Sequence, residues 1–246
     1  MNDLLYAYEL KAPHHPRPPP RTIKLSHEPW MGVVHFRDYT QQMDRTTVAE
    51  LEALVKQAAL TVLDRRGLGP ETLLLETCGG YRRGKELSGD ADVLVSCTQA
   101  EGQEGMREAL KKVMQEEMGL DLIVLKEGGA VQGFTISDHP HEKLPSHDNM
   151  LTLLKHEGRY RRLDVICPPP DQWGACVLGW SGTKQMEKDL RDYADSIGLY
   201  LSQQAIYKAE GPRVHNPKSP DGIFHDERDI WEFMGLRFLP PRLRWA

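Results

Sequence analysis

Long apolar runs, paired cysteines and excess positive charge are all missing from this sequence. None of its 246 residues belongs to an apolar stretch near the ~20 residues that span a bilayer, and no basic-apolar leader opens the chain. We therefore expect an intracellular protein without a membrane partner. The formal net charge of −5 argues against a protein that coats nucleic acid indiscriminately, although local basic strips can still grip phosphates.

The cysteines form no CxxC pair, and most lie in or beside apolar runs, which is typical of reduced thiols in a core. The histidine-rich stretch from Asp138 to Asp148 offers zinc ligands. Its proline-broken spacing fits no usual zinc pattern, so we expect no zinc there. The four cysteines are Cys78, Cys97, Cys167 and Cys176.

The composition, 39% hydrophobic and 27% charged, is that of a globular protein, and the length allows a sizeable core. "PHHPRPPP" (Pro13 to Pro20) is a polyproline-type tether that cannot be helical, so residues 1–22 are expected to be loosely held. "PPPD" (Pro168 to Asp171) breaks the chain sharply and is the best internal boundary.

Hydrophobic periodicity predicts the elements on either side of that boundary. A helix follows Asp44, with Thr47 and Glu50 as its capping box, and a second amphipathic helix runs from Met106 to Met118. Strands are predicted at 72–77, 92–96, 121–126, 150–155 and 160–167. A helix bearing Met186 and Leu190, a strand pair at 199–208 and a helix at 226–236 follow. This layout predicts an α+β protein, with a mixed sheet domain before a smaller α+β domain.

The stretch "CGGYRRGKELSGDADVLV" (Cys78 to Val95) combines glycines, cations and two carboxylates. Paired glycines let the backbone approach a ligand, and the cations indicate that the ligand is an anion. On an extended strand, Asp90 and Asp92 point to the same face, roughly 6.5–7 Å apart. Two such hard oxygen ligands suit one or two Mg²⁺ ions bridged by phosphates, although a D-x-D pair alone is more often a solvated turn.

A third carboxylate, Asp164, lies in the strand "YRRLDVIC". Leu163, Val165 and Cys167 alternate onto one face of that strand, so Asp164 and Arg162 point to the other. An acid on an otherwise apolar strand is not required for folding, which favours a phosphate-and-metal site over the solvated turn.

These motifs resemble those of the family X DNA polymerases. "GGYRRGKELSGDADVLV" is similar to the family's phosphate-and-metal motif, and "RRLDVICPPPDQWGACVLGWSGTKQMEKDLRDYA" to its third-aspartate strand and nucleotide-selecting region. "DERDIWEFMGLRFLPP" is similar to the family's C-terminal end. The resemblance implies a remnant of a duplex-binding subdomain at 23–45, a nucleotidyltransferase-type palm at 46–170 and a thumb-like, nucleotide-selecting subdomain at 171–246.

The resemblance also implies a role for each matching residue. Asp90, Asp92 and Asp164 would be the catalytic ligands of two Mg²⁺ ions, which Mn²⁺ could replace. Arg162 would lie near the primer end and Arg191 near the template minor groove, so both would bind DNA. The incoming dNTP, or an rNTP, would be bound by Arg45, Gly80, Arg83, Ser88, Gly89, Gly179, Trp180, Gly182, Lys184 and Glu187.

From the same resemblance we expect a nuclear, template-directed polymerase that fills gaps or joins broken DNA ends, with end-joining repair proteins as partners. "GW" at Gly179–Trp180 is similar to polymerase mu and terminal transferase, and "SGD" at Ser88–Asp90 to polymerases beta and lambda; fungal end-joining members combine both. The family's lyase and helix-hairpin-helix segments have no match here. Two alternatives stay open: another nucleotidyltransferase on the same palm, and a truncated, weakly active or inactive protein that binds DNA ends.

Overall fold

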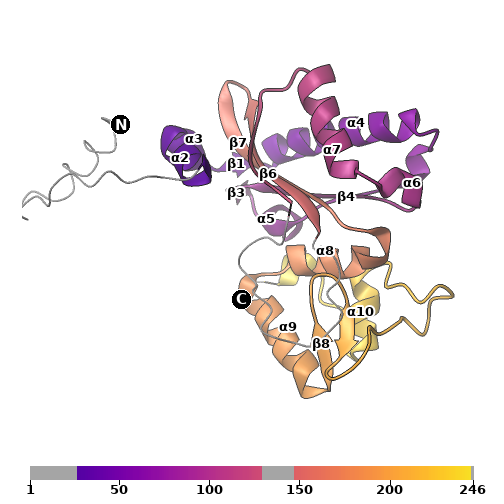
Figure 1. The fold of residues 1–246 in the computed structure, drawn as a ribbon. Helices are drawn as coiled ribbons and strands as arrows, with labels where there is room; N and C mark the ends of the chain where they lie inside the picture. Colours follow the sequence, from indigo (N-terminus) through magenta and orange to yellow (C-terminus); the bar gives the residue numbers. More distant parts are fainter. Residues whose placement is uncertain (1–26, 129–146, 245–246) are drawn as a thin grey trace, which may run out of the picture.

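A five-stranded mixed sheet forms the centre of the larger lobe (Figure 1). The computed structural model describes residues 27–128 and 147–244. The predicted tether at 1–22 and most of the long insert at 127–149 therefore lie outside the described residues. The strands follow the order β2 (Leu73–Thr77), β4 (Ala91–Cys97), β7 (Arg159–Cys167), β6 (Asp148–His156) and β5 (Leu122–Glu127). Strands β4 and β7 are parallel and all other neighbours are antiparallel, which confirms the predicted mixed sheet.

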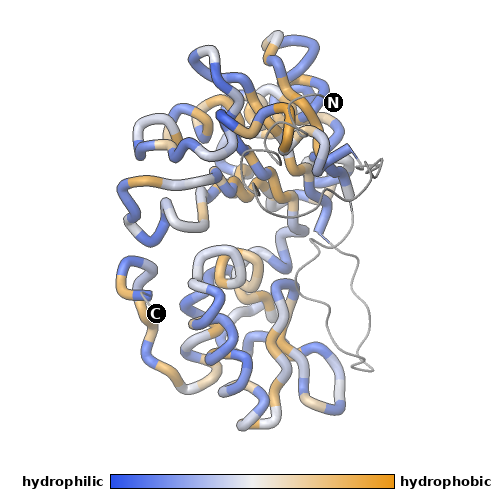
Figure 2. Tube along the Cα trace, turned by 90° about the vertical axis from the view of Figure 1, so that its left-hand side faces the viewer, coloured by the Kyte–Doolittle hydropathy of each residue, from blue (hydrophilic) through white to orange (hydrophobic). Residues whose placement is uncertain are grey.

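Two helices cover one face of this sheet. They are α4 (Arg45–Arg65) and α7 (Met106–Lys112), and α7 continues into a π-helical turn at Val113–Glu117. Short α6 (Ala100–Gln103) leads into α7. The predicted apolar stripe of α4 is buried against alternate residues of β4 and β7, and Figure 2 shows apolar chain gathered inside this lobe. The core includes Val48, Leu51, Val55, Ala58, Val62, Val93, Val95, Leu110, Leu163 and Val165.

The predicted capping box of α4 was wrong. The N-cap is Asp44, whose side chain accepts a hydrogen bond from the Thr47 backbone N–H at 2.8 Å. Thr47 is therefore the third helical residue. An aspartate is as good an N-cap as a threonine, and here the helix starts three residues earlier than the capping-box pattern suggested.

The opposite face of the sheet carries α8 (Trp173–Ser181), which the sequence analysis did not predict as a helix. Its residues Cys176 and Val177 pack on Leu94 of β4 and Ile166 of β7. The segment is apolar on nearly every side, so it has no helical alternation of polar and apolar residues to detect.

The smaller lobe is built on α8 and the rest of the C-terminal region. It contains α9 (Lys184–Ser196), the pair β8 (Leu199–Leu201) and β9 (Ile206–Lys208), and α10 (Glu227–Phe233). Short 3-10 turns, η3 (Pro170–Gln172) and η4 (Pro241–Leu243), begin and end this lobe. It has its own apolar core, which includes Leu178, Leu190, Ile206, Ile230 and Trp231. The predicted strand pair and terminal helix are confirmed.

The first described residues form a short helical pair beside the sheet (Figure 1). Helices α2 (His27–Val34) and α3 (Phe36–Tyr39) lead into β1 (Met43–Asp44), which pairs with β3 (Leu87–Ser88). Within the described residues, no helix is both long and apolar enough to cross a bilayer.

A buried acid joins the two lobes. The Glu227 side chain in α10 is only 1% exposed and lies 2.6 Å from Arg82 of the larger lobe and 2.8 Å from Arg244. Arg82 also donates to the Ser181 hydroxyl at 2.9 Å and contacts Glu76 at 2.7 Å. Two guanidinium groups therefore depend on one carboxylate that is shielded from water.

We expect Glu227→Ala to lower the free energy of unfolding by about 3–5 kcal/mol, because it removes the buried carboxylate from two guanidinium groups and leaves Arg82 with only the more exposed Glu76 as an anionic partner. The matched control is Glu232→Ala on the same helix, since Glu232 pairs with Lys218 on the surface and exposed pairs contribute about 1 kcal/mol or less. Urea unfolding of both variants measures the difference. Equal losses would show that the buried cluster contributes no more than a surface pair.

Candidate active site

Three carboxylates converge where β4 and β7 lie side by side. Asp92 stands directly opposite Asp164 in the parallel pairing of these strands, and neighbouring strands lie about 4.8 Å apart. Asp90 immediately precedes β4 and lies two residues before Asp92. One oxygen from each of the three lies within 4.8 Å of the others, which is close enough for shared metal ions.

Strand alternation explains which way these side chains point. Leu94 follows Asp92 by two residues and Ile166 follows Asp164 by two, and both pack against α8. The carboxylates therefore lie on the same face of the sheet as α8, which packs on these strands farther toward their carboxyl ends. The intervening Val93, Leu163 and Val165 face α4 and α7 instead, as the sequence predicted for β7.

The carboxylates carry more negative charge than their surroundings balance. Burial, together with repulsion from Asp90 and Asp164, raises the pKa of Asp92 well above its ordinary value. Burial also raises the pKa of Asp164 to about 7, despite the opposing effect of Arg162. Hard oxygen donors, close spacing and uncompensated charge are what a divalent cation requires, so the residues fit metal ions.

The glycine-rich segment folds into the one-turn helix α5 (Gly79–Arg82) directly beside these acids. Gly79 has a φ of 57°, and a Cβ there would overlap the Asp92 carboxylate. Gly79 is thus the residue that lets the loop backbone reach the acids, whereas the resemblance to the family implied this role for Gly80. A side chain at Gly80 would contact Lys85 and come within 3.6 Å of the Ser88 hydroxyl.

Arg45 begins α4 and holds this loop. Its guanidinium donates to the backbone carbonyls of Tyr81 at 2.8 Å and Lys85 at 3.1 Å, and it lies 4.1 Å from the Tyr81 ring centroid. Ser88, in β3, is buried at the end of the same loop, and Gly89 is exposed with open space around it. The structure therefore brings Arg45, Gly80 and Ser88 together around one loop.

Arg83 reaches from this loop into the smaller lobe. Its guanidinium donates to the carbonyls of Ser181 at 3.1 Å and Gly182 at 2.8 Å. Its Nε is buried and has no hydrogen-bond partner among the described residues. A buried donor without a partner is costly, so a ligand that reached this N–H would remove that cost.

The end of α8 places the predicted nucleotide-selecting residues. Trp180 packs against the apolar group that contains Cys78 and Leu94, so part of its role is in packing. Its indole N–H is buried and unpaired in the described structure. A side chain at Gly179 would overlap that of Gln203, and one at Gly182 would overlap Met186.

Lys184, Glu187 and Arg191 follow on α9. Lys184 is exposed in its first turn, whereas Glu187 is 8% exposed and pairs with Arg191 at 3.2 Å. Burial raises the pKa of Glu187 to about 7, while the opposing charges of Arg191, Arg83 and Lys184 lower it. Arg83 is thus close enough to affect Glu187, which connects α9 with the loop beside the aspartates.

Family comparisons agree with this geometry. Residues 42–170 match the model of the DNA polymerase beta palm, and residues 176–245 match the model of the DNA polymerase beta thumb. The chain belongs to the family X DNA polymerases. It is 26% identical over 87% of its length to DNA polymerase lambda of Rattus norvegicus and 27% identical over 90% to DNA nucleotidylexotransferase of Xenopus laevis. It is also 28% identical over 71% to DNA polymerase type-X family protein pol4 of Schizosaccharomyces pombe.

This family X chain spans only part of those relatives. The match covers 35% of the rat protein, 45% of the frog protein and 34% of the yeast protein. Members of the family are metal-dependent, and the Asp90, Asp92 and Asp164 group is where the described structure offers a matching acidic site.

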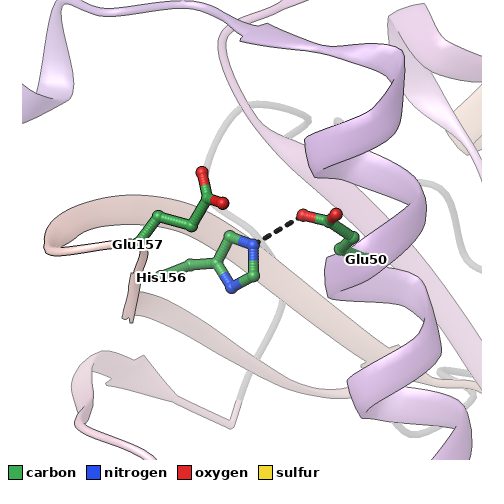
Figure 3. Close-up of side chains that lie close together, drawn as sticks. All are labelled: Glu50, His156 and Glu157. Atoms are coloured by element: carbon green, nitrogen blue, oxygen red, sulfur yellow. Dashed lines mark hydrogen bonds and ion pairs between the residues drawn. The ribbon is translucent and has the colours of Figure 1, made fainter.

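A second group of possible ligands, Glu50, His156 and Glu157, lies where α4 meets the β6–β7 turn (Figure 3). His156 Nε2 is 2.7 Å from Glu50 Oε2, and both carboxylates are exposed. This contact ties α4 to the turn. Exposed acidic groups commonly gather without a metal, so the geometry alone assigns no ion here.

The raised pKa of Glu187 predicts how stability varies with pH. The folded chain keeps a proton that the unfolded chain releases between pH 4.5 and about 7, so this residue stabilises folding at low pH and the effect disappears as pH rises. At 1.36 kcal/mol per pH unit, the change is at most about 3 kcal/mol. Glu187→Gln should therefore gain unfolding free energy relative to the parent between pH 5 and 8.

Urea unfolding at pH 5 and pH 8 checks this prediction. Glu210→Gln, an exposed position in the same lobe, is the control and should follow the parent at both values. Parallel pH profiles for the parent and Glu187→Gln would contradict the assignment.

Proposed function

We propose that this chain is a DNA-directed DNA polymerase that adds nucleotides to a primer 3′-OH. The observation that carries the proposal is the convergence of Asp90, Asp92 and Asp164 beside a glycine-rich loop with an unpaired buried donor. Family membership and the relatives' names support it. Template DNA would specify which nucleotide is added. The substrate would be a dNTP, and an rNTP would also be accepted.

The acids would hold two divalent cations, with Mg²⁺ the proposed metal and Mn²⁺ able to replace it. Asp90 and Asp92 would be ligands of both ions, and Asp164 of the ion nearer the primer hydroxyl. When bound, such ions lower the pKa of that hydroxyl and neutralise charge that develops on the phosphates. The protein's own contribution would be to hold three carboxylates on or directly next to two hydrogen-bonded strands, so that they need to move little when metal ions bind.

The loop would bind the triphosphate. Arg45 shapes the backbone of the loop, Gly79 clears space beside Asp92 and Gly80 clears space beside Lys85 and Ser88. The Ser88 hydroxyl and Arg83 Nε–H would donate to phosphate oxygens. Since Arg83 already grips the carbonyls at the end of α8, phosphate binding would also act on the smaller lobe.

DNA contacts and the biological setting belong to the same proposal. Arg162 beside Asp164 would meet the primer end, and Arg191 on α9 the template minor groove. We propose gap filling or the joining of broken ends, in the nucleus and with repair proteins as partners. These points rest on the resemblance to the family and on its repair polymerases.

Primer extension on a gapped duplex with Mg²⁺ tests the proposed reaction. Asp164→Asn should lower the rate by roughly 1,000-fold or more, which is about 4 kcal/mol, because it removes charge where the reaction needs it. Asp64→Asn on the exposed face of α4 is the matched control and should retain the parent rate. Extension by Asp164→Asn at the parent rate would refute the proposed role of this residue.

The same assay separates the alternatives. Extension of a single-stranded RNA primer in preference to the gapped duplex would identify another nucleotidyltransferase. Binding of DNA ends without any extension by the parent chain would identify an end-binding protein instead.

Selection of the sugar gives a further prediction. Gly179 has no side chain of its own, so the backbone just before Trp180 in α8 can shift more easily than it could with a larger residue there. We expect the kcat/KM ratio of dNTP over rNTP to be about 100-fold or less, which corresponds to about 2.7 kcal/mol. Steady-state incorporation of matched dNTP and rNTP measures it. A ratio above several thousand would exclude weak sugar selection.

A further inference from the structure

Arg162 lies between the metal-binding acids. One terminal nitrogen is 3.1 Å from Asp90 and the other is 3.3 Å from Asp164. The guanidinium therefore occupies the electrostatic position that a divalent cation would compete for. Any ion that binds both acids must overcome the attraction of Arg162 for the same oxygens.

The ring of Tyr39, the last residue of α3, also lies against this guanidinium. The Arg162 carbon Cζ lies 5.4 Å from the centroid of the Tyr39 ring, within the range of a cation–π contact. No pattern in the sequence indicates a role for Tyr39, because helix α3 and strand β7 are separated by more than one hundred residues.

Helix α3 is fixed to the strand that carries Arg162. The Tyr160 backbone N–H donates to Asp38 Oδ2 at 3.0 Å, and the His35 and Tyr160 rings lie 4.3 Å apart. These contacts hold Tyr39 at a set distance from β7, so the ring is a fixed support and not a chance surface contact.

We propose that Tyr39 is a positioning residue: its ring holds Arg162 against Asp90 and Asp164, so the N-terminal helical pair sets how readily these acids accept metal ions. The proposal rests on the proposed function, because it concerns the same acids. A phosphate of arriving DNA is an alternative anion for Arg162. If Arg162 moved to such a phosphate when DNA bound, Asp90 and Asp164 would become free to bind metal ions.

Direct binding of Mn²⁺, followed by electron paramagnetic resonance without DNA or nucleotide, tests the inference apart from activity. Arg162→Gln should bind Mn²⁺ about tenfold more tightly than the parent. Tyr39→Leu should tighten binding about two- to fivefold, which corresponds to about 0.5–1 kcal/mol for the lost cation–π contact. Tyr39→Phe keeps the ring face and should bind as the parent does.

The double variant decides between positioning and a general structural effect. With Arg162→Gln already present, Tyr39→Leu should change Mn²⁺ affinity no further, because the ring then has no cation to hold. Arg65→Gln, which removes the pairing with Glu117 elsewhere on α4, controls for net charge and should leave the affinity unchanged.

An unchanged affinity in Tyr39→Leu, or equal tightening with and without Arg162, would overturn this inference and leave the proposed function standing. If Asp164→Asn bound Mn²⁺ as tightly as the parent chain does, the proposed metal site itself would be overturned. Thermal unfolding of each variant confirms that the compared chains are folded.

Discussion

The parallel pairing of β4 and β7 is the constraint on which the rest of the structure depends. It sets Asp92 opposite Asp164 and, with Asp90, places three carboxylates close together. Burial raises the pKa of both Asp92 and Asp164, and repulsion from the neighbouring carboxylates raises it further, so folding these acids together is costly unless cations balance them. Nearby features therefore serve either to supply positive charge or to make room for it.

Contacts from several parts of the chain supply this positive charge or space. Arg162 balances two of the acids from their own sheet, and Gly79 lets loop backbone approach Asp92. Arg82 and Arg83 extend from the same loop to α8 and α10, so the loop beside the acids is also the junction between the lobes. A ligand that binds this loop would therefore act on both lobes at once.

Local patterns in the sequence were enough to predict the strands of the sheet and the main helices, and they singled out three acids that the structure brings together. Strand alternation around Leu163 and Val165 even gave the direction of Asp164 correctly. The failures had local physical causes: Asp44 capped α4 in place of Thr47, and α8 had no polar face to mark it as a helix. The support of Arg162 by Tyr39 depends on packing between distant segments, which no spacing in the sequence reveals.

The most direct measurement is anomalous scattering from Mn²⁺ in a crystal of the chain with gapped DNA and a non-hydrolysable dNTP. The account predicts anomalous density between Asp90, Asp92 and Asp164, with the triphosphate at the loop that begins with Gly79. Manganese density at Glu50 and His156, with none between the three aspartates, would contradict it.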